Sequence, residues 1–300
     1  MIILYIRGGL GNQMSQAAYS WILAKRTGDR VCLDRSSYET YKIRNFALDR
    51  MKIRAELPDV GTSVSPAVMK KLRMTRFLYH VFQKAVTKFT GETGRGIFTF
   101  LARHGYYYNF DSTWYGFPEA KASVKVKDVY GYFLAEKYFH DDREALMDLF
   151  TPTAEPEGRE REYLDRITAC EAAAISLRLQ DDYAKNAMAN VCDEAYFRAG
   201  IAYLREKVPG VKFFIFADDI SRAKALDLGI DAEYIEGMTD VQGMRLMNHC
   251  RHYIISNSSF SWWGAYLSRN EDRIIVAPKR WMNNPKNDYH DKYYGNMVRM

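Results

Sequence analysis

The chain opens on short apolar runs separated by glycines and amphipathic stretches. Residues 2–6 form a continuous, β-branched-rich apolar run, which predicts a buried strand. A glycine-rich turn interrupts this run, and the pattern that follows predicts a helix over 13–26. A second apolar run at 31–33, ending at Asp34, predicts the next strand. Strand, glycine turn, helix and strand in this order are typical of a nucleotide-binding α/β fold.

In the second half of the chain, apolar runs of strand length alternate with amphipathic stretches of helix length. The predicted strands are 173–177, 212–217, 232–235, 253–256 and 274–277. The predicted helices are 194–207, 221–227, 240–250 and 260–268. The segment 151–158 holds proline and glycine but no large apolar side chain, so we expect a linker between domains 1–150 and 159–300. The sequence therefore predicts an α/β protein with two facing domains, each with a parallel sheet.

Residues 66–90 differ from both halves because their charged side chains are all basic. These are Lys70, Lys71, Arg73, Arg76, Lys84 and Lys88. Apolar residues recur at helical spacing, at Met74, Phe77, Leu78, Val81, Phe82, Ala85, Val86 and Phe89. The pattern predicts either an ordinary surface helix that packs through this stripe or a helix that rests on anionic lipid, giving a peripheral membrane contact.

The composition excludes several classes of protein. A hydrophobic fraction of 47% suits a globular core, and a formal net charge of +6 is too weak by itself to predict a nucleic-acid partner. No apolar run approaches the roughly 18 residues that span a bilayer, and the apolar start lacks the basic region of a signal peptide. We therefore expect a cytoplasmic protein, at most peripheral at the inner membrane.

The aromatic segment 105–116 predicts a loop that lines a sugar site or packs in the core.

Cysteines and histidines give little sign of a metal centre. The four cysteines, at positions 32, 170, 192 and 250, are far apart, which predicts reduced thiols rather than disulfides or a zinc site. His249 and His252 alone make a poor metal site. The chain also lacks the Asp-x-Asp triplet of metal-chelated sugar-nucleotide sites. We expect neither a metal nor a resident cofactor.

The turn after the first predicted strand contains four candidate cleft-loop residues, Gly9, Gly11, Asn12 and Gln13. Glycines let the backbone approach a ligand closely, and the helix N-terminus that follows favours negative charge. Asp34 lies near the position of the ribose-binding acid in dinucleotide folds, but Met14 stands where that motif requires glycine or alanine. The turn predicts a sugar- or phosphate-binding loop, with a plain tight turn as the alternative and a NAD site as the weaker one.

A second candidate site follows the predicted strand at 253–256. Its four candidate donor-binding residues are Asn257, Ser258, Ser259 and Phe260. Hydroxyls, backbone N–H groups and a helix dipole converge there, and together they predict a phosphate cradle. Simple capping of the next helix by Asn257 or Ser258, worth about 1 kcal/mol, is the alternative. Trp262 and Trp263 are expected in the core.

Two further predicted strands deliver charged residues to the same sheet edge. Arg178 follows one of them, and a guanidinium suits a pyrophosphate because it pairs two oxygens and keeps its charge. A surface ion pair with Asp181 or Asp182 is the alternative for this arginine. Asp218 and Asp219 follow the other strand, where a carboxylate can accept hydrogen bonds from guanine. Asp219 can also cap the next helix, and both roles can hold.

These segments, in this order, resemble the α-1,2-fucosyltransferases of glycosyltransferase family eleven, most of them bacterial. The family's opening GGLGNQMFQYA is similar to residues 8–18, and its NSTFSWW motif to residues 257–263. The FxxFSxD motif resembles 213–219, the segment GYFQSEKYF resembles 131–139, and 277–281 also fit. The resemblance spans nearly the whole chain.

The resemblance implies a GT-B fold, in which two Rossmann-like domains face each other. The C-terminal domain would bind the donor GDP-β-L-fucose, and the N-terminal domain would bind the acceptor. The implied reaction is a metal-independent, inverting transfer of L-fucose to the 2-hydroxyl of a terminal galactoside on an oligosaccharide or a lipid-linked glycan. Arg178 matches the position that holds the donor β-phosphate, so the resemblance makes it the residue that stabilises leaving-group charge.

The family's HxRxGD motif is altered here, since Ser176 replaces its histidine and Gln180 its glycine. A sugar-nucleotide-binding protein with impaired catalysis is therefore an alternative function. An NAD-dependent oxidoreductase built on the first glycine turn is a further, weaker one. Asp34, Asp111 and Glu136 are all candidate catalytic bases, and the sequence selects none of them.

Overall fold

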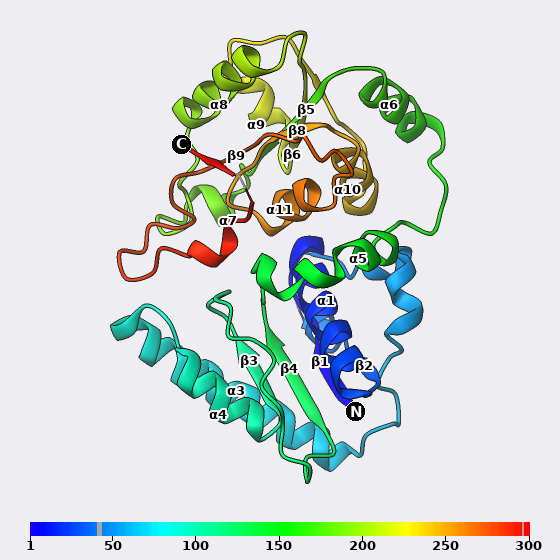
Figure 1. Cartoon of the computed structure of the whole chain (residues 1–300), viewed down its shortest axis with the longest axis vertical. Helices are drawn as coiled ribbons and strands as arrows, with labels where there is room; N and C mark the ends of the chain where they lie inside the picture. The colour runs from blue at the N-terminus through cyan, green and yellow to red at the C-terminus, as the bar shows by residue number, and fades with distance from the viewer. Residues whose placement is uncertain (41–43, 296) are drawn as a thin grey trace. The chain divides into compact units, whose positions relative to one another are not determined.

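The structure, a computed structural model, describes residues 1–40, 44–295 and 297–300, except for the side chain of Asp182. The chain forms two compact units, each with its own parallel sheet (Figure 1). Unit 1 consists of Met1–Phe150 and Asn284–Tyr293. Unit 2 consists of Thr151–Asn283 and Tyr294–Met300.

Residues 284–293 belong to unit 1, although the sequence-based division assigns them to the second domain. The Asp291 carboxylate explains this placement, because it is buried among residues of unit 1. It accepts a hydrogen bond from the backbone N–H of Trp114 at 2.8 Å and pairs with Lys137 Nζ at 2.8 Å. These are long-range partners, which local sequence pattern does not reveal.

Unit 1 is built on a four-stranded sheet with the order β2-β1-β4-β3, and all its strand pairs are parallel. Its strands are β1 (Ile2–Tyr5), β2 (Val31–Asp34), β3 (Tyr106–Asn109) and β4 (Lys127–Gly131). Its helices are α1 (Leu10–Thr27), α2 (Ser37–Thr40), α3 (Pro66–Thr90), α4 (Arg95–Arg103) and α5 (Arg143–Leu149). The predicted strand–turn–helix–strand opening is confirmed. The loop expected at 105–116 is wrong in its first part, which forms β3 because tyrosines suit a buried strand.

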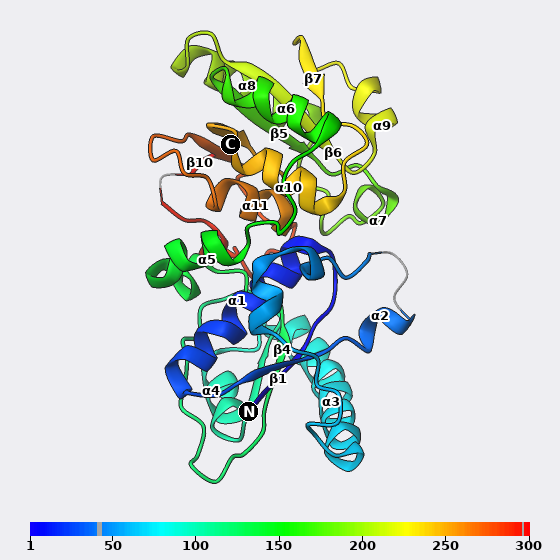
Figure 2. The same cartoon turned by 90° about the vertical axis from the view of Figure 1, so that its right-hand side faces the viewer.

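Helices α1 and α3 cover opposite faces of this sheet (Figure 2). Side chains alternate along a strand, so Ile3 and its register partner Cys32 lie on one face, where Leu72 of α3 packs against them. On the other face, the ring of Tyr19 from α1 lies 6.5 Å from the ring of Tyr107. The hydrophobic core of unit 1 therefore lies on both faces of the sheet, under α3 on one face and under α1 on the other.

Helix α3 confirms the predicted helix at 66–90 and corrects the expectation that it packs through its apolar stripe. Ser65 caps its start by accepting a hydrogen bond from Val68 N at 3.4 Å, and Gly91, at φ 84°, ends it. The side chains that face the sheet are those of Leu72, Arg76 and Tyr79, while the stripe is exposed. None of the described helices has the length and apolar character needed to cross a bilayer.

Arg76 anchors α3 through a buried ionic cluster. Its Nη1 lies 2.6 Å from Asp34 Oδ2, and its Nε and Nη2 contact the two carboxylate oxygens of Asp128 at 3.0 and 2.5 Å. The hydroxyl of Tyr108 donates to Asp128 Oδ2 at 2.5 Å, and the guanidinium lies 4.4 Å from the centroid of the Tyr5 ring. Arg76, Asp34 and Asp128 are each at most 4% exposed, so these charges are stable in the interior only as a set.

Unit 2 is built on a six-stranded sheet with the order β10-β9-β8-β5-β6-β7, again with parallel pairs. Its strands are β5 (Ala172–Leu177), β6 (Lys212–Ala217), β7 (Ala232–Tyr234), β8 (His252–Ile254), β9 (Ile275–Ala277) and β10 (Val298–Arg299). Its helices are α6 (Gly158–Thr168), α7 (Asp181–Ala184), α8 (Glu194–Lys207), α9 (Ile220–Ala225), α10 (Asp240–Asn248) and α11 (Ser259–Tyr266). The predicted alternation of strands and helices is confirmed, and α6, α7 and β10 are additions to it.

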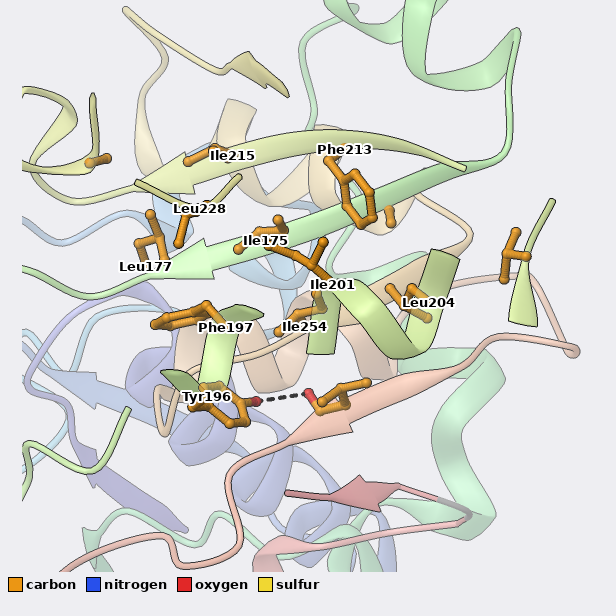
Figure 3. Packing of buried hydrophobic residues seen from close by; sticks show 14 residues of the cluster. Ile175, Leu177, Tyr196, Phe197, Ile201, Leu204, Phe213, Ile215, Leu228 and Ile254 are labelled. Atoms are coloured by element: carbon orange, nitrogen blue, oxygen red, sulfur yellow. Dashed lines mark hydrogen bonds between the residues drawn. The ribbon is translucent and has the colours of Figure 1, made fainter. Parts of the chain in front are cut away.

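Strand β5 lies at the centre of this sheet and is buried along its whole length, which is why it reads as an unbroken run of small and apolar residues. Figure 3 shows Ile175 of β5 and Phe197 of α8 within one hydrophobic cluster. The hydroxyl of Tyr196 donates to the carbonyl groups of Ile255 at 2.6 Å and Val276 at 3.2 Å. Helix α8 is therefore tied by hydrogen bonds as well as packing to the sheet edge where the candidate site lies.

Candidate functional site

Three of the predicted segments reach the same edge of the unit 2 sheet. Strand β5 lies between β8 and β6, so Arg178, Ser256 and Asp218 follow three adjacent parallel strands at their carboxyl ends. The chain proceeds from β5 to β6 and β7 on one side, then crosses to β8 and β9 on the other. The topological switch point thus lies between β5 and β8, and open parallel sheets bind ligands outside their carboxyl ends at such a point.

Arg178 is half-buried at this switch point and lies over an aromatic ring. Its guanidinium carbon is 5.2 Å from the centroid of Tyr183 in α7, a cation–π distance that orients the side chain. The Asp181 carboxylate, an alternative partner from sequence, pairs with Arg222 Nη2 and Lys185 Nζ, both at 2.7 Å. The side chain of Asp182, the other alternative, lies outside the described residues.

Asp218 joins the end of β6 to the loop that carries Arg178. Its Oδ1 accepts hydrogen bonds from the backbone N–H of Leu179 at 2.7 Å and of Gln180 at 3.2 Å. The Gln180 side chain completes the link by donating from Nε2 to the Asp218 carbonyl at 3.0 Å. Gln180, which departs from the resembled motif, therefore helps to hold the loop. Its Oδ2 is buried, so in this structure the Asp218 carboxylate holds the loop, and its recognition of a guanine base stays a prediction.

Asp219 acts as a helix cap, as one sequence alternative states. Its Oδ1 accepts from the backbone N–H of Arg222 at 3.0 Å, at the first turn of α9. Arg222 in turn donates from Nη1 to the Leu179 carbonyl at 2.6 Å. Asp219 thus contributes to the same loop indirectly, by setting the position of the helix whose arginine holds it.

Asn257 is enclosed by its own protein partners, and we reassign it from a ligand-binding to a positioning residue. Its Nδ2 donates to the carbonyl groups of Ala189 at 2.8 Å and Trp281 at 2.7 Å, which uses both amide hydrogens. Its Oδ1 accepts from the Tyr183 hydroxyl at 2.6 Å. The side chain is buried, so these contacts fix the turn between β8 and α11.

Tyr183 is the residue that sequence reasoning missed. Besides donating to Asn257, its hydroxyl accepts from the backbone N–H groups of Val191 at 3.2 Å and Cys192 at 3.3 Å. Burial raises the pKa of this phenol above its ordinary value. The one available sign was an aromatic residue five positions after Arg178, at the same predicted sheet edge.

The start of α11 brings the positive end of a helix dipole to the end of β8. Ser258 caps it, its Oγ accepting from the backbone N–H of Phe260 at 3.3 Å, so Ser258 has the expected capping role, while phosphate binding at this turn stays a prediction. Ser258, Ser259 and Phe260 are half-buried, so the first turn is accessible to a ligand. Trp262 and Trp263 are fully buried, as expected from the sequence. The groups here that suit an anion are therefore the backbone N–H groups and the helix dipole at the start of α11, not the Asn257 side chain.

In unit 1, the cleft loop is held together by Gln13, which is therefore a positioning residue rather than a candidate ligand contact. Its Nε2 donates to the carbonyls of Gly8 at 2.9 Å and Asn45 at 2.8 Å, and its Oε1 accepts from Ala47 N at 2.9 Å. The left-handed position in the turn is Gly8, at φ 86°, where an added Cβ would lie 2.9 Å from Asn12 Nδ2.

The other cleft-loop candidates differ in backbone conformation and in exposure. Gly9 is the N-cap of α1 with φ −75°, so its backbone does not require glycine, and an added Cβ would make only ordinary contact with Arg44. Gly11 is buried in the first turn of α1, whereas Asn12 is half-buried beside it. Asn12 is the predicted polar side chain of this loop that the structure leaves partly accessible.

The three carboxylates that were candidate bases lie in different environments. Burial alone would raise the pKa of Asp34, but the charge of Arg76 and hydrogen bonds from Ser36 outweigh it, and the pKa is lowered. Glu136 pairs with His140 Nδ1 at 2.6 Å. Asp111 is buried, which raises its pKa, and it accepts from Tyr115. The ion-paired Asp34 is thus unsuited to proton abstraction.

Within the described residues, no cluster of three metal-ligating side chains occurs.

Comparison with known proteins places the chain in a family. The family model described as Glycosyl transferase family 11 matches residues 129–298. An alpha-1,2-colitosyltransferase of Escherichia coli is 30% identical over 292 residues, covering 94% of this chain and 92% of that protein. The O-antigen biosynthesis glycosyltransferase WbnK of Escherichia coli is 24% identical, covering 92% of this chain and 93% of that protein.

Solved structures show the fold. The crystal structure of NodZ alpha-1,6-fucosyltransferase soaked with GDP-fucose has a TM-score of 0.51 at 13% identity and covers 89% of this chain and 91% of its own. The same enzyme co-crystallized with GDP has a TM-score of 0.51 at 15% identity, covering 88% and 90%. The GT-B fold expected from the sequence is confirmed. The family model matches more than half of this chain, and the relative at 30% identity aligns with nearly all of it. The chain therefore belongs to glycosyl transferase family 11 and is a glycosyltransferase.

Proposed function

We propose that this glycosyltransferase moves L-fucose from GDP-β-L-fucose to the 2-hydroxyl of a terminal galactoside, with inversion, to form an α-1,2 linkage. The observation that carries the proposal is that Arg178, Asp218 and the start of α11 follow three adjacent parallel strands at the carboxyl edge of the unit 2 sheet. A cation and a helix N-terminus suit a pyrophosphate, and a carboxylate suits guanine. The α-1,2 specificity is supported by the relative that is an alpha-1,2-colitosyltransferase.

In this proposal, Arg178 provides the main stabilisation of the leaving group. As the glycosidic bond to the diphosphate breaks, about one negative charge develops on the departing GDP, and a fixed cation lowers the energy of that state. The Tyr183 ring orients the guanidinium in advance, and the backbone of the α11 first turn adds the dipole. Because these groups supply positive charge themselves, we propose that the transfer proceeds without a metal ion.

Colitose is a second candidate for the transferred sugar. It is L-fucose without the 3-hydroxyl, and the relative at 30% identity is named for it. In this chain Ser176, which replaces the histidine of the resembled motif, is buried at the end of β5, directly before the Arg178 loop. Because serine is smaller than the histidine of the resembled motif, we expect this chain to hold its donor differently from the resembled enzymes. An assay of GDP-fucose and GDP-colitose with the same acceptor distinguishes the two candidate donors.

The nucleotide class is tested by calorimetric titration of the purified protein with GDP in EDTA, with UDP and NAD as comparators. We expect GDP to bind at one site per chain without metal, and UDP and NAD to bind at least about tenfold more weakly, a difference of about 1.4 kcal/mol. The comparators are a matched control, because UDP carries the same diphosphate as GDP but not the guanine edge assigned to Asp218. Tighter binding of NAD would support the oxidoreductase alternative and remove the proposed donor.

A further inference from the structure

Helix α3 presents an apolar face to solvent. The exposed apolar side chains and their exposed fractions are Met74 55%, Phe77 64%, Leu78 59%, Val81 55%, Phe82 44% and Phe89 75%. At 3.6 residues per turn these positions form one stripe, and the buried side chains of Leu72, Arg76 and Tyr79 lie on the opposite side of the helix. The stripe is therefore not the surface by which α3 packs in unit 1, and a contiguous apolar stripe of this kind marks an interaction surface.

The charges around this stripe are of one sign. The exposed charged side chains of α3 are Lys70, Lys71, Arg73, Lys84 and Lys88, and the helix sequence contains no acidic residue. Arg73 and Lys84 are three helical turns apart, on one flank of the stripe. Lys70 and Lys88, five turns apart, lie within the stripe, at the angular position between Phe77 and Val81, and Lys71 lies on its other side. The surface thus combines large apolar side chains with long cationic ones.

We propose that α3 docks this glycosyltransferase on the surface of an anionic lipid bilayer. Phenylalanine and leucine side chains enter the boundary between headgroups and acyl chains, and the lysines reach the lipid phosphates alongside. A second copy of this chain is a poorer occupant, because pairing two such faces would bring their like charges together. The helix lies along the surface rather than across the bilayer, since none of the described helices is long and apolar enough to cross it.

The way in which α3 is held suits this role. Its buried side is fixed by the Arg76 pairs with Asp34 and Asp128, so the stripe is presented on a rigid helix rather than on one that must fold at the membrane. A preformed face pays less ordering entropy on binding than a disordered segment does. The inference does not depend on the identity of the donor sugar, and its test needs no transfer reaction.

The test is co-sedimentation of the full chain with vesicles of phosphatidylglycerol and phosphatidylethanolamine, compared with phosphatidylcholine vesicles. We expect the protein to pellet with the anionic vesicles at low salt, less so as salt rises, and hardly with phosphatidylcholine. The double variant Phe77→Ser, Phe82→Ser should weaken binding at least about tenfold, since each phenylalanine buries a large apolar area. Lys84→Gln with Lys88→Gln should weaken it and flatten its salt dependence.

The matched control is Phe100→Ser, which removes an exposed phenylalanine of α4, 63% exposed, from the same unit. Its helix packs through Phe98 against Tyr107, on the α1 side of the sheet, so vesicle binding should stay unchanged. Absence of pelleting at low salt, equal binding to phosphatidylcholine, or equal loss in the Phe100 variant would overturn the proposal. Sedimentation velocity on the same samples gives a further arm: a dimer that the Phe77 and Phe82 changes dissociate would assign the face to self-association instead.

Discussion

Replacing Arg178 by alanine is expected to lower kcat/KM for sugar transfer more than about a hundredfold, while leaving the melting temperature nearly unchanged. The loss corresponds to about 3 kcal/mol of transition-state stabilisation, the scale for removing one preorganised group that faces developing charge. Arg178 is half-buried over Tyr183 at the sheet edge rather than in the core, so its removal leaves the hydrophobic cluster of unit 2 intact. The measurement is steady-state kinetics with a fixed acceptor.

Two further variants make the Arg178 result specific. Arg178→Lys keeps the charge but loses the two-pronged geometry, so we expect an intermediate rate. Arg198→Ala removes an exposed arginine of α8 that pairs with Glu194 and Asp227, and it should leave kcat/KM within about twofold. Activity of Arg178→Ala within a few fold of the unaltered chain would show that another group stabilises the leaving diphosphate.

Replacing Arg76 by methionine is expected to lower the free energy of unfolding by about 3–5 kcal/mol, the largest stability effect that we expect from one substitution. The change leaves the carboxylates of Asp34 and Asp128 buried without their cation, and breaking a buried ion pair from one side has costs of this size. Urea denaturation of the full chain, followed by tryptophan fluorescence and circular dichroism, measures it.

Arg73, about one helical turn before Arg76 on α3, provides the control. Arg73→Met removes an exposed arginine of the same helix and should change the free energy of unfolding by no more than about 0.5 kcal/mol. Adding Asp34→Asn and Asp128→Asn to Arg76→Met should recover part of the loss, because no unpaired charge then remains buried. A loss for Arg76→Met no larger than that for Arg73→Met would show that the cluster does not anchor α3.

The pH dependence of this loss follows from the lowered pKa of Asp34 in the folded chain. A carboxyl group whose pKa is lowered by folding stabilises the folded state above its unfolded pKa, about 3.9, and this contribution is lost as the pH falls through the folded pKa. The difference between the unaltered chain and Arg76→Met should therefore shrink in acid and be largest near neutral pH.

The sheet of unit 2 and the start of unit 1 could be predicted because their strands are continuous apolar runs bounded by turn residues. Strand β4 could not, since its Lys127 and Asp128 resemble a surface loop. Asp128 is tolerated in the core only because Arg76, distant in sequence, pairs with it. For the same reason the α3 pattern predicted a helix but not its buried side: Arg76 looks like one more surface cation until its two carboxylates are placed.

The candidate site shows the same limit. Sequence position after a strand predicted correctly that Arg178 and Asp218 reach one sheet edge, because parallel strands end together. It could not separate residues that contact a ligand from residues that hold the loops, since amides serve both purposes. Asn257 and Gln13 belong to the second group only because of partners such as Tyr183 and the Asn45 carbonyl, which the fold brings to them.

The most direct test of the proposed function is a transfer assay in EDTA that offers GDP-fucose and GDP-colitose to a terminal galactoside and to its 2-deoxy analogue. The proposal predicts metal-independent transfer of fucose to the galactoside, an α-linked product at the 2-oxygen by NMR, and no product on the 2-deoxy analogue. Preferential use of GDP-colitose would reassign the donor within the same chemistry. A folded, GDP-binding protein that transfers neither sugar across a broad panel of galactosides would contradict the proposal and identify a sugar-nucleotide-binding protein instead.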